Sequence, residues 1–376
     1  MTTSVSAPAV PFLDLRAPYV ELRAEIDDAL LRAVDSGWYL LARELEGFER
    51  AYAEYAEARR CLGVANGLDA LLLALRALGV GPGDEVIVPS NTYIATWIAV
   101  TQAGATPVPV EPDERTYNID PARVAAAITS RTKVILPVHL YGLPADMPAL
   151  RAVADAHGLR VLDDAAQAHG ARVRGRRVGA LADVTAWSFY PGKNLGAFGD
   201  AGGITTDDDA LADAVRVLRN YGSSVKYVNE VVGYNSRLDE IQAAVLAAKL
   251  PHLDAWNARR ARLAARYTEE LADTDLVLPL VPDWADPVWH LYVVRSRDRA
   301  ALQQSLQRDG IGTMIHYPIP PHRQAAYASL GFAPDAFPIA NAIADEVLSL
   351  PMGPHLTDEQ QDRVIDAVRR HAGPRP

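Results

Sequence analysis

The chain contains a single cysteine, Cys61, in 376 residues. One cysteine excludes both an internal disulfide and a zinc site built from several cysteines. The sequence also lacks any apolar run approaching the roughly 18 residues that a membrane span needs. Its first ten residues have neither the basic start nor the apolar block of a signal peptide. We therefore expect a cytoplasmic protein without a membrane segment.

Basic charge is scarce as well. The 37 lysine and arginine residues are outnumbered by 47 aspartate and glutamate residues, which gives a net charge of −10, and no long basic run interrupts this balance. A primary role in nucleic-acid binding is therefore disfavoured. No GxGxxG segment follows the first expected strand, and its absence argues against a nicotinamide-dependent enzyme.

What the chain does have is the pattern of an α/β protein. Hydrophobic residues make up 49% and charged residues 22%, which is typical of a globular protein with a large core. Near-continuous apolar segments alternate with helical stretches, as in a mostly parallel sheet that is covered on both faces. The expected strands are residues 85–89, 133–138, 160–163, 184–189 and 290–295.

The length predicts two domains, at about 150 residues or somewhat more for each. A helical stripe through Leu238 and Val245 ends before Pro251, and we place the boundary there. Residues 1–250 would then form an N-terminal arm and a large domain, and residues 251–376 a smaller α+β domain. We expect roughly the first ten residues to be a loose arm, residues 256–271 to be helical and residues 335–370 to be mostly helical.

The most informative segment is residues 187–196. An expected strand delivers Ser188, and a Pro-Gly pair then precedes Lys193. A loop of this kind at the carboxyl end of a sheet lies where α/β proteins bind ligands. Burial would lower the pKa of the lysine and let it act as a nucleophile or form a Schiff base. A solvated surface lysine is the alternative that this segment leaves open.

A second segment, residues 161–170, places Asp163 and Asp164 at the end of another expected strand. Adjacent side chains of a strand point to opposite faces, so one carboxylate can meet a ligand while the other caps the next turn. Aspartate before two alanines is also a good helix N-cap, which is the alternative reading. A carboxylate at this place can pair with a protonated pyridine nitrogen and keep the ring an electron sink.

Two further segments carry weaker signals. Asn66 and Gly67 precede an apolar helix, and the free amides of such a helix N-terminus can bind phosphate. Tyr93 follows the strand at residues 85–89. It can stack on a flat ring or simply belong to the core.

The order of these four elements resembles the DegT/StrS group of pyridoxal-phosphate (PLP) aminotransferases, which act on nucleotide-linked keto sugars. The resemblance runs from about residue 11 to about residue 370. It implies the fold of type I PLP enzymes, with a large domain around a mostly parallel seven-stranded sheet and a smaller C-terminal α+β domain. It also implies PLP as the cofactor and a homodimer with shared active sites. We expect no metal site, because nothing else with ligand spacing stands near His316 and His322.

The resemblance also assigns roles to individual residues. Lys193 would bind PLP covalently and move protons, and Asp164 would pair with the pyridine nitrogen. The expected cofactor contacts are Gly67, Leu68 and Ser188 at the phosphate, Tyr93 over the ring, Gln167 near its phenolic oxygen, and Asn235 reaching the neighbouring subunit's cofactor. The expected substrate contacts are Tyr221, Arg237, His316 and Tyr317. The sequence leaves open that Asn235 and Arg237 only shape a turn and that His316 is structural.

Within the family, residues 66–70, 90–95, 139–142, 188–193 and 290–294 resemble the branch that aminates C3 of dTDP-3-keto-6-deoxyhexoses. This implies that L-glutamate donates the amino group and that the product is a dTDP-3-amino sugar for antibiotic or glycan biosynthesis. The alternatives are a 4-keto nucleotide-sugar aminotransferase, a PLP-dependent sugar dehydratase and a non-enzymatic PLP-binding regulator. Related dehydratases typically carry histidine in place of the lysine, so Lys193 favours transamination. A regulator would need an added basic DNA-binding segment, whereas the N-terminal arm is short and not basic.

Overall fold

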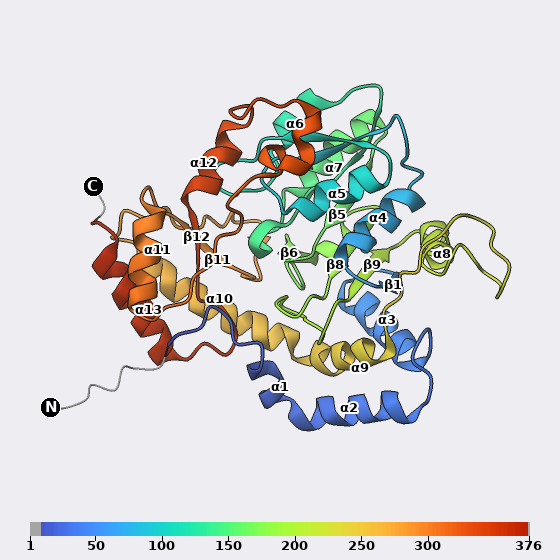
Figure 1. The fold of residues 1–376 in the computed structure, drawn as a ribbon, viewed down its shortest axis with the longest axis horizontal. Helices are drawn as coiled ribbons and strands as arrows, with labels where there is room; N and C mark the ends of the chain where they lie inside the picture. Colours follow the sequence, from blue (N-terminus) through green and yellow to red (C-terminus); the bar gives the residue numbers. More distant parts are fainter. Residues whose placement is uncertain (1–8, 375–376) are drawn as a thin grey trace.

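A seven-stranded sheet in the order β1-β9-β8-β5-β4-β2-β3 forms the centre of the computed structural model, which describes residues 9–374 (Figure 1). Its strands are β1 (Arg60–Val64), β2 (Glu85–Pro89), β3 (Thr106–Val110), β4 (Thr132–Ile135), β5 (Arg160–Asp164), β8 (Val184–Ser188) and β9 (Gly202–Thr206). Strand β9 runs antiparallel to both neighbours, and the other pairs are parallel. The expected α/β fold with a mostly parallel seven-stranded sheet is therefore confirmed.

Helices cover both faces of this sheet. Alternate residues of a strand point to opposite faces, so each strand packs against helices on both sides. Ile87 and Val161 pack with α3 (Arg43–Tyr55), α7 (Met147–His157) and α9 (Glu240–Lys249). Their neighbours Val86 and Leu162 pack with α4 (Gly67–Ala77), α5 (Ile94–Gln102) and α8 (Asp209–Leu218). The strands buried on both faces read as continuous apolar runs for this reason.

Several strands differ from the predicted ones. The strand expected at residues 133–138 ends at Ile135, and Pro137 beyond it has no amide hydrogen to give to a ladder. Strands β1, β3 and β9 were missed. Strand β3 contains two prolines, which argue against a strand interior, but it lies at the edge of the sheet, where proline is tolerated.

A second, antiparallel pair of strands lies in the C-terminal part of the chain: β11 (Tyr292–Arg295) and β12 (Val347–Leu350). Four helices accompany it: α10 (Leu253–Glu270), α11 (Arg299–Arg308), α12 (Pro338–Glu346) and α13 (Asp358–His371). The prediction that residues 335–370 are mostly helical missed β12. The domain boundary near residue 250 stays a prediction, and β11, β12 and these helices lie beyond it.

The remaining elements are short. They are α6 (Pro121–Ala127), a small sheet of β6 (Arg172–Val173), β7 (Arg176–Arg177) and β10 (Ala285–Asp286), and five 3₁₀ turns at η1 (Leu140–Gly142), η2 (Val178–Ala180), η3 (Leu250–His252), η4 (Pro321–Arg323) and η5 (Ala325–Leu330). Over residues 9–374, every helix is too short or too polar to cross a lipid bilayer.

The N-terminal arm is anchored to the far end of the chain. Val10 is buried, its amide donates to the carbonyl of Gly310 at 2.9 Å, and its carbonyl accepts from the amide of Gly312 at 2.9 Å. The prediction of a loose arm is thus wrong at Val10, while residues 1–8 lie outside the described part. Beyond the arm, α1 (Ala17–Glu21) leads into α2 (Arg23–Asp35), which packs against α9 (Figure 1).

Candidate active site

A cavity of about 910 Å³ lies at the carboxyl ends of β2, β5 and β8. Its lining includes the residues expected at the cofactor, apart from Asn235: Gly67, Leu68, Tyr93, Asp164, Gln167, Ser188 and Lys193. His316 and Tyr317, expected at the substrate, line it as well. Among these predicted residues, Gly67 and Tyr317 lie furthest apart in the sequence, and the fold brings them to the same cavity.

Lys193 follows β8 on a tight loop, in which its amide donates to the carbonyl of Tyr190 at 2.8 Å. Burial lowers the pKa of the Lys193 amine to about 8, although the carboxylate of Asp164 opposes the shift. A lysine with this pKa has an appreciable neutral fraction near neutral pH. Lys193 is partly buried in the wall of the cavity, and its amine can act there as a nucleophile and a base.

Asp164 is buried and held from two sides. The hydroxyl of Thr96 donates to its Oδ2 at 3.0 Å, and the amide of Ala166 donates to its Oδ1 at 3.2 Å. Burial raises the pKa of Asp164, while these two donors and Lys193 act in the opposite direction. A cation bound in the cavity would therefore stabilise the carboxylate further.

Asp163 points to the other side of β5, as the alternation predicted. Its Oδ2 lies 3.3 Å from Nε2 of His139, and both side chains are completely buried. Nδ1 of His139 accepts the amide hydrogen of Ala145 at 3.0 Å, so Nε2 carries the ring proton and faces the carboxylate. The pair lies behind the site, because the cavity lining includes Asp164 and not Asp163.

The N-terminus of α4 forms an anion cradle. Asn66 caps the helix by accepting the amide hydrogen of Asp69 at 2.8 Å, which leaves the amides of Gly67 and Leu68 without an intrahelical acceptor. A Cβ atom on Gly67 would lie 2.6 Å from Cβ of Ser188, so only glycine fits here. Two helix amides beside a serine hydroxyl fit the phosphate of PLP.

Gln167 links Tyr317 of the cavity wall to Tyr141 behind it. Its Oε1 accepts the amide hydrogen of Tyr141 at 2.6 Å, and its Nε2 donates to the hydroxyl of Tyr317 at 3.0 Å. The ring of Tyr317 then lies 5.1 Å from that of Tyr93, centroid to centroid, at an angle of 36°. Both rings line the cavity. The resemblance placed Gln167 near the phenolic oxygen of PLP, and that placement stays a prediction.

Two histidines of the cavity are neutral at neutral pH. Nδ1 of His316 lies 2.8 Å from Oγ of Ser349, and burial lowers the pKa of His316 to about 4. Nδ1 of His290 lies 3.1 Å from Oδ1 of Asn194, and burial holds the pKa of His290 well below its usual value. His290 was not predicted as a site residue, although the segment 290–294 was singled out. His169 lies apart from the cavity among the rings of Tyr52, Trp187 and Phe189.

Three predicted residues lie away from the cavity of their own chain. Arg237 donates to Oδ1 of Asn220 at 3.0 Å, and its guanidinium lies 5.4 Å from the ring centroid of Tyr221. Asn235 pairs with Asn220 through a backbone bridge. All of them belong to the connection between α8 and α9, which projects from the body of the molecule (Figure 1).

No group of three or more histidine, cysteine, aspartate or glutamate side chains is arranged to hold a metal ion within residues 9–374. Of the two histidines considered as metal ligands, His316 lies within hydrogen-bond distance of Ser349, as noted above. The ring of His322 packs against that of Phe337, with 4.9 Å between the ring centroids.

The fold and the cavity define a transferase of the PLP-dependent class: a lysine after β8, a buried carboxylate at the end of β5 and an anion cradle at α4 converge on one space. The sequence profile of the DegT/DnrJ/EryC1/StrS aminotransferase family matches residues 20–369. The chain belongs to this family.

Individual relatives agree with this assignment. The chain is 58% identical over 364 residues to the erythromycin biosynthesis sensory transduction protein EryC1 of Saccharopolyspora erythraea, covering 96% of this chain and 100% of that protein. It is 57% identical over 373 residues to a dTDP-3-amino-3,4,6-trideoxy-alpha-D-glucose transaminase of Streptomyces venezuelae, covering 99% and 98%. The crystal structure of S. venezuelae DesV in complex with a ketimine intermediate superposes with a TM-score of 0.96 at 58% identity, covering 97% of this chain and 98% of that one.

Proposed function

We propose that this aminotransferase uses PLP to move an amino group from L-glutamate to C3 of a dTDP-3-keto-6-deoxyhexose. The observation that carries the proposal is the convergence of Lys193, Asp164 and the α4 cradle in one cavity. The sugar is supported by the transaminase relative that is 57% identical over nearly the whole length of both chains. The product would be a dTDP-3-amino sugar for antibiotic or glycan biosynthesis.

The residues of the cavity fit the cofactor in two places. The amides of Gly67 and Leu68, with the hydroxyl of Ser188, would hold its phosphate. The carboxylate of Asp164 would face its pyridine nitrogen, held by Thr96 and Ala166. When bound, PLP supplies an electron sink that stabilises negative charge on the carbon next to the amino nitrogen.

Lys193 supplies the acid and base. With a pKa of about 8, Nζ of Lys193 can accept a proton at neutral pH and also give it back. A lysine near its ordinary pKa is a poor base at that pH. Asp164 lies close enough to influence this pKa, so the two groups act as one electrostatic unit. The neutral ring of His316 adds a hydrogen-bonding group to the cavity without adding charge.

The proposal includes a homodimer whose subunits complete each other's sites. The connection between α8 and α9 leaves Tyr227 and Val232 each 89% exposed, which is unusual for large apolar side chains in a monomer. Asn235, at the end of this connection, lies outside the cavity of its own chain. A second copy of the chain would cover the apolar residues and receive Asn235 near its cofactor phosphate.

A single-turnover experiment tests the reaction. The enzyme is loaded with the amino group by L-glutamate, freed of excess donor, and mixed separately with a dTDP-3-keto-6-deoxyhexose and its 4-keto isomer, and the sugars are analysed by mass spectrometry. Amination of the 3-keto sugar alone is the expected result. Amination of the 4-keto sugar alone would overturn the sugar assignment, loss of water without amination would point to a dehydratase, and reaction with neither sugar would overturn the reaction class.

A complementation experiment tests the shared sites. Lys193→Ala and Asn235→Ala chains are each expected to be inactive alone, and co-expression should restore about a quarter of wild-type activity, because half of the random dimers contain one intact site. Two inactive variants that stay inactive when co-expressed would show that Asn235 acts within its own chain.

A further inference from the structure

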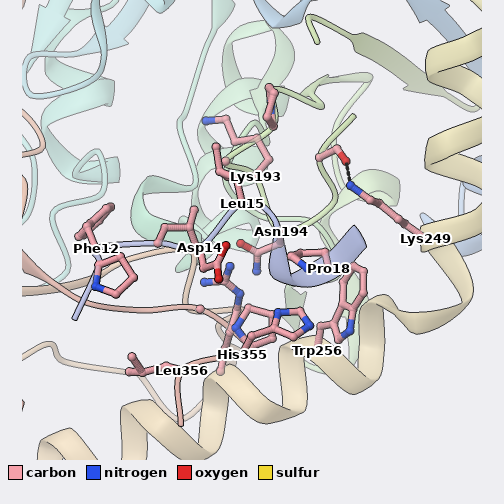
Figure 2. Close-up of a pocket in the computed structure, with 18 of the residues that line it drawn as sticks. Phe12, Asp14, Leu15, Pro18, Lys193, Asn194, Lys249, Trp256, His355 and Leu356 are labelled. Atoms are coloured by element: carbon pink, nitrogen blue, oxygen red, sulfur yellow. Dashed lines mark hydrogen bonds between the residues drawn. The ribbon is translucent and has the colours of Figure 1, made fainter. Parts of the chain in front are cut away.

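A second cavity, of about 460 Å³, lies on the other side of the Lys193 loop (Figure 2). The N-terminal arm from Pro11 to Pro18 forms one wall, and helices α9 and α10 with residues 353–357 form the other. Both cavities are lined by Phe12, Leu13, Leu15, Gly192 and Lys193, so the N-terminal arm and the loop that carries Lys193 lie between them. The function proposed above uses only the first cavity.

Arg260 reaches the second cavity from α10 and is only 3% exposed. Its Nη1 donates to three neutral acceptors, the carbonyls of Trp289 at 3.2 Å, His290 at 3.3 Å and Met352 at 3.5 Å. Its Nε has no hydrogen-bond acceptor among the described residues. Burial alone lowers its pKa to about 10, since no carboxylate in the described part of the chain offsets the loss of hydration.

Lys249 is the second buried cation of this lining, at 4% exposure. Its amine donates to the carbonyl of Gly196 at 2.6 Å and lies 4.4 Å from the ring centroid of Phe198 (Figure 2). Burial lowers its pKa to about 8, and none of the ion pairs found over residues 9–374 includes it. A lysine is rarely buried so deeply without an acidic partner.

Asp14 is the one carboxylate in this lining that could offset the positive charge of Arg260 and Lys249. Asp14 is exposed, and its Oδ1 accepts the amide hydrogens of Arg16 at 2.8 Å and Ala17 at 3.2 Å, so it serves the start of α1. The cavity therefore has buried positive charge and an unused guanidinium donor but no matching negative charge from the described residues. Buried charges normally have a partner, and an unsatisfied buried donor normally has a ligand, water or ion to explain it.

We propose that this second cavity is a binding site for a small oxyanion, a phosphate or a carboxylate, attracted by the buried positive charge of Arg260 and Lys249 in its lining. Interaction with the anion would compensate both cations for the hydration that they lose on burial. The remaining N–H donors of the Arg260 guanidinium would donate to the oxygens of the anion. The bound anion would lie behind the loop of Lys193, separate from the phosphate cradle at α4. The proposal is independent of the sugar that the enzyme aminates.

Isothermal titration calorimetry of the PLP-loaded enzyme, at fixed ionic strength, tests the site with two probes, inorganic phosphate and malonate. We expect one anion per chain, with affinity at least about tenfold weaker in Lys249→Met. Lys249→Arg, which keeps the charge, should bind nearly as well as the wild type. Lys133→Met is the matched control, because it removes an exposed lysine of β4 outside the lining and should change nothing.

The outcomes separate cleanly. Binding of phosphate alone identifies a phosphate site, and binding of malonate alone identifies a carboxylate site. Equal affinity in the wild type and Lys249→Met would overturn the proposal, as would the lack of saturable binding of both probes up to about 10 mM. Binding that is lost in Ser188→Ala but kept in Lys249→Met would place the anion in the first cavity and equally overturn it.

Discussion

The hydroxyl of Thr96 donates a hydrogen bond to Oδ2 of Asp164 at 3.0 Å, and both side chains are buried. Oγ1 of Thr92 lies a further 2.9 Å from that of Thr96, so a short chain of hydroxyls supports the carboxylate from α5. Thr96 is not among the residues that line the first cavity. We expect it to position Asp164 and to favour its ionised form, because its hydrogen bond lowers the pKa of the carboxyl group.

Replacing Thr96 with valine keeps the shape of the side chain and removes the donor. The pKa of Asp164 should rise further, and turnover should fall about tenfold or more, since a hydrogen bond to a charged group contributes roughly 1.5–3 kcal/mol. Steady-state kinetics as a function of pH provide the measurement. Thr96→Ser should retain activity, and a Thr96→Val enzyme with the wild-type pH profile would contradict the role.

Replacing Lys193 with alanine should abolish turnover, because the proposed reaction needs the amine as acid and base. The fold should stay intact, because this amine makes no side-chain hydrogen bond within residues 9–374. Product formation measured by chromatography is the readout, and circular dichroism checks the fold. Lys133→Met serves as the control for the loss of a lysine outside the cavity. Normal turnover in Lys193→Ala would disprove the assignment of the catalytic residue.

Replacing Gly67 with alanine should weaken PLP binding, because the new Cβ would lie 2.6 Å from Cβ of Ser188 and push the two walls of the cradle apart. A loss of about 2 kcal/mol, close to thirtyfold in affinity, is the scale of overpacking. Equilibrium dialysis against PLP measures it. Gly47→Ala is the control, since a Cβ there meets nothing within 4 Å, and equal affinities in the two variants would refute the prediction.

His169 should make the protein sensitive to acid. Burial lowers the pKa of His169 in the folded state from 6.5 to about 3. Below pH 6.5, His169 therefore becomes protonated in the unfolded chain while it stays neutral in the folded chain. The free energy of unfolding then falls as pH falls, by about 2 kcal/mol between pH 6.5 and pH 5 for this group alone. Urea unfolding of the wild type and His169→Phe at both pH values measures the difference. Parallel losses in the two proteins would contradict it.

The sequence predicted the centre of the sheet better than its margins. Central strands such as β2 and β5 are apolar because both faces of the sheet are covered, and such an apolar run can be recognised directly in the sequence. Strand β3 escaped detection because its prolines are permitted only by its edge position, which depends on the finished sheet. Val10 was taken for part of a loose arm because its partners, Gly310 and Gly312, lie three hundred residues away.

The same distinction applies to the site. Asp164 ends β5 and Lys193 follows β8 on a short loop, and a local pattern was enough to single them out. The bond from Gln167 to Tyr317 and the position of His290 depend on how the C-terminal part packs over the sheet, which no local pattern encodes. Arg260 and Lys249 gave no signal, because a buried cation reads like any other helical cation until the chain is folded.

The attachment of Val10 to residues 310–312 has a consequence for synthesis on the ribosome. Phe12 and Leu13, two residues further along, line both cavities, yet the backbone that anchors them is among the last to be made. All strands of the seven-stranded sheet and the Lys193 loop precede residue 207, so they are synthesised well before these anchoring residues. A chain truncated before residue 310 would therefore lack the backbone bonds that fix Val10 and, through it, the positions of Phe12 and Leu13 at the two cavities.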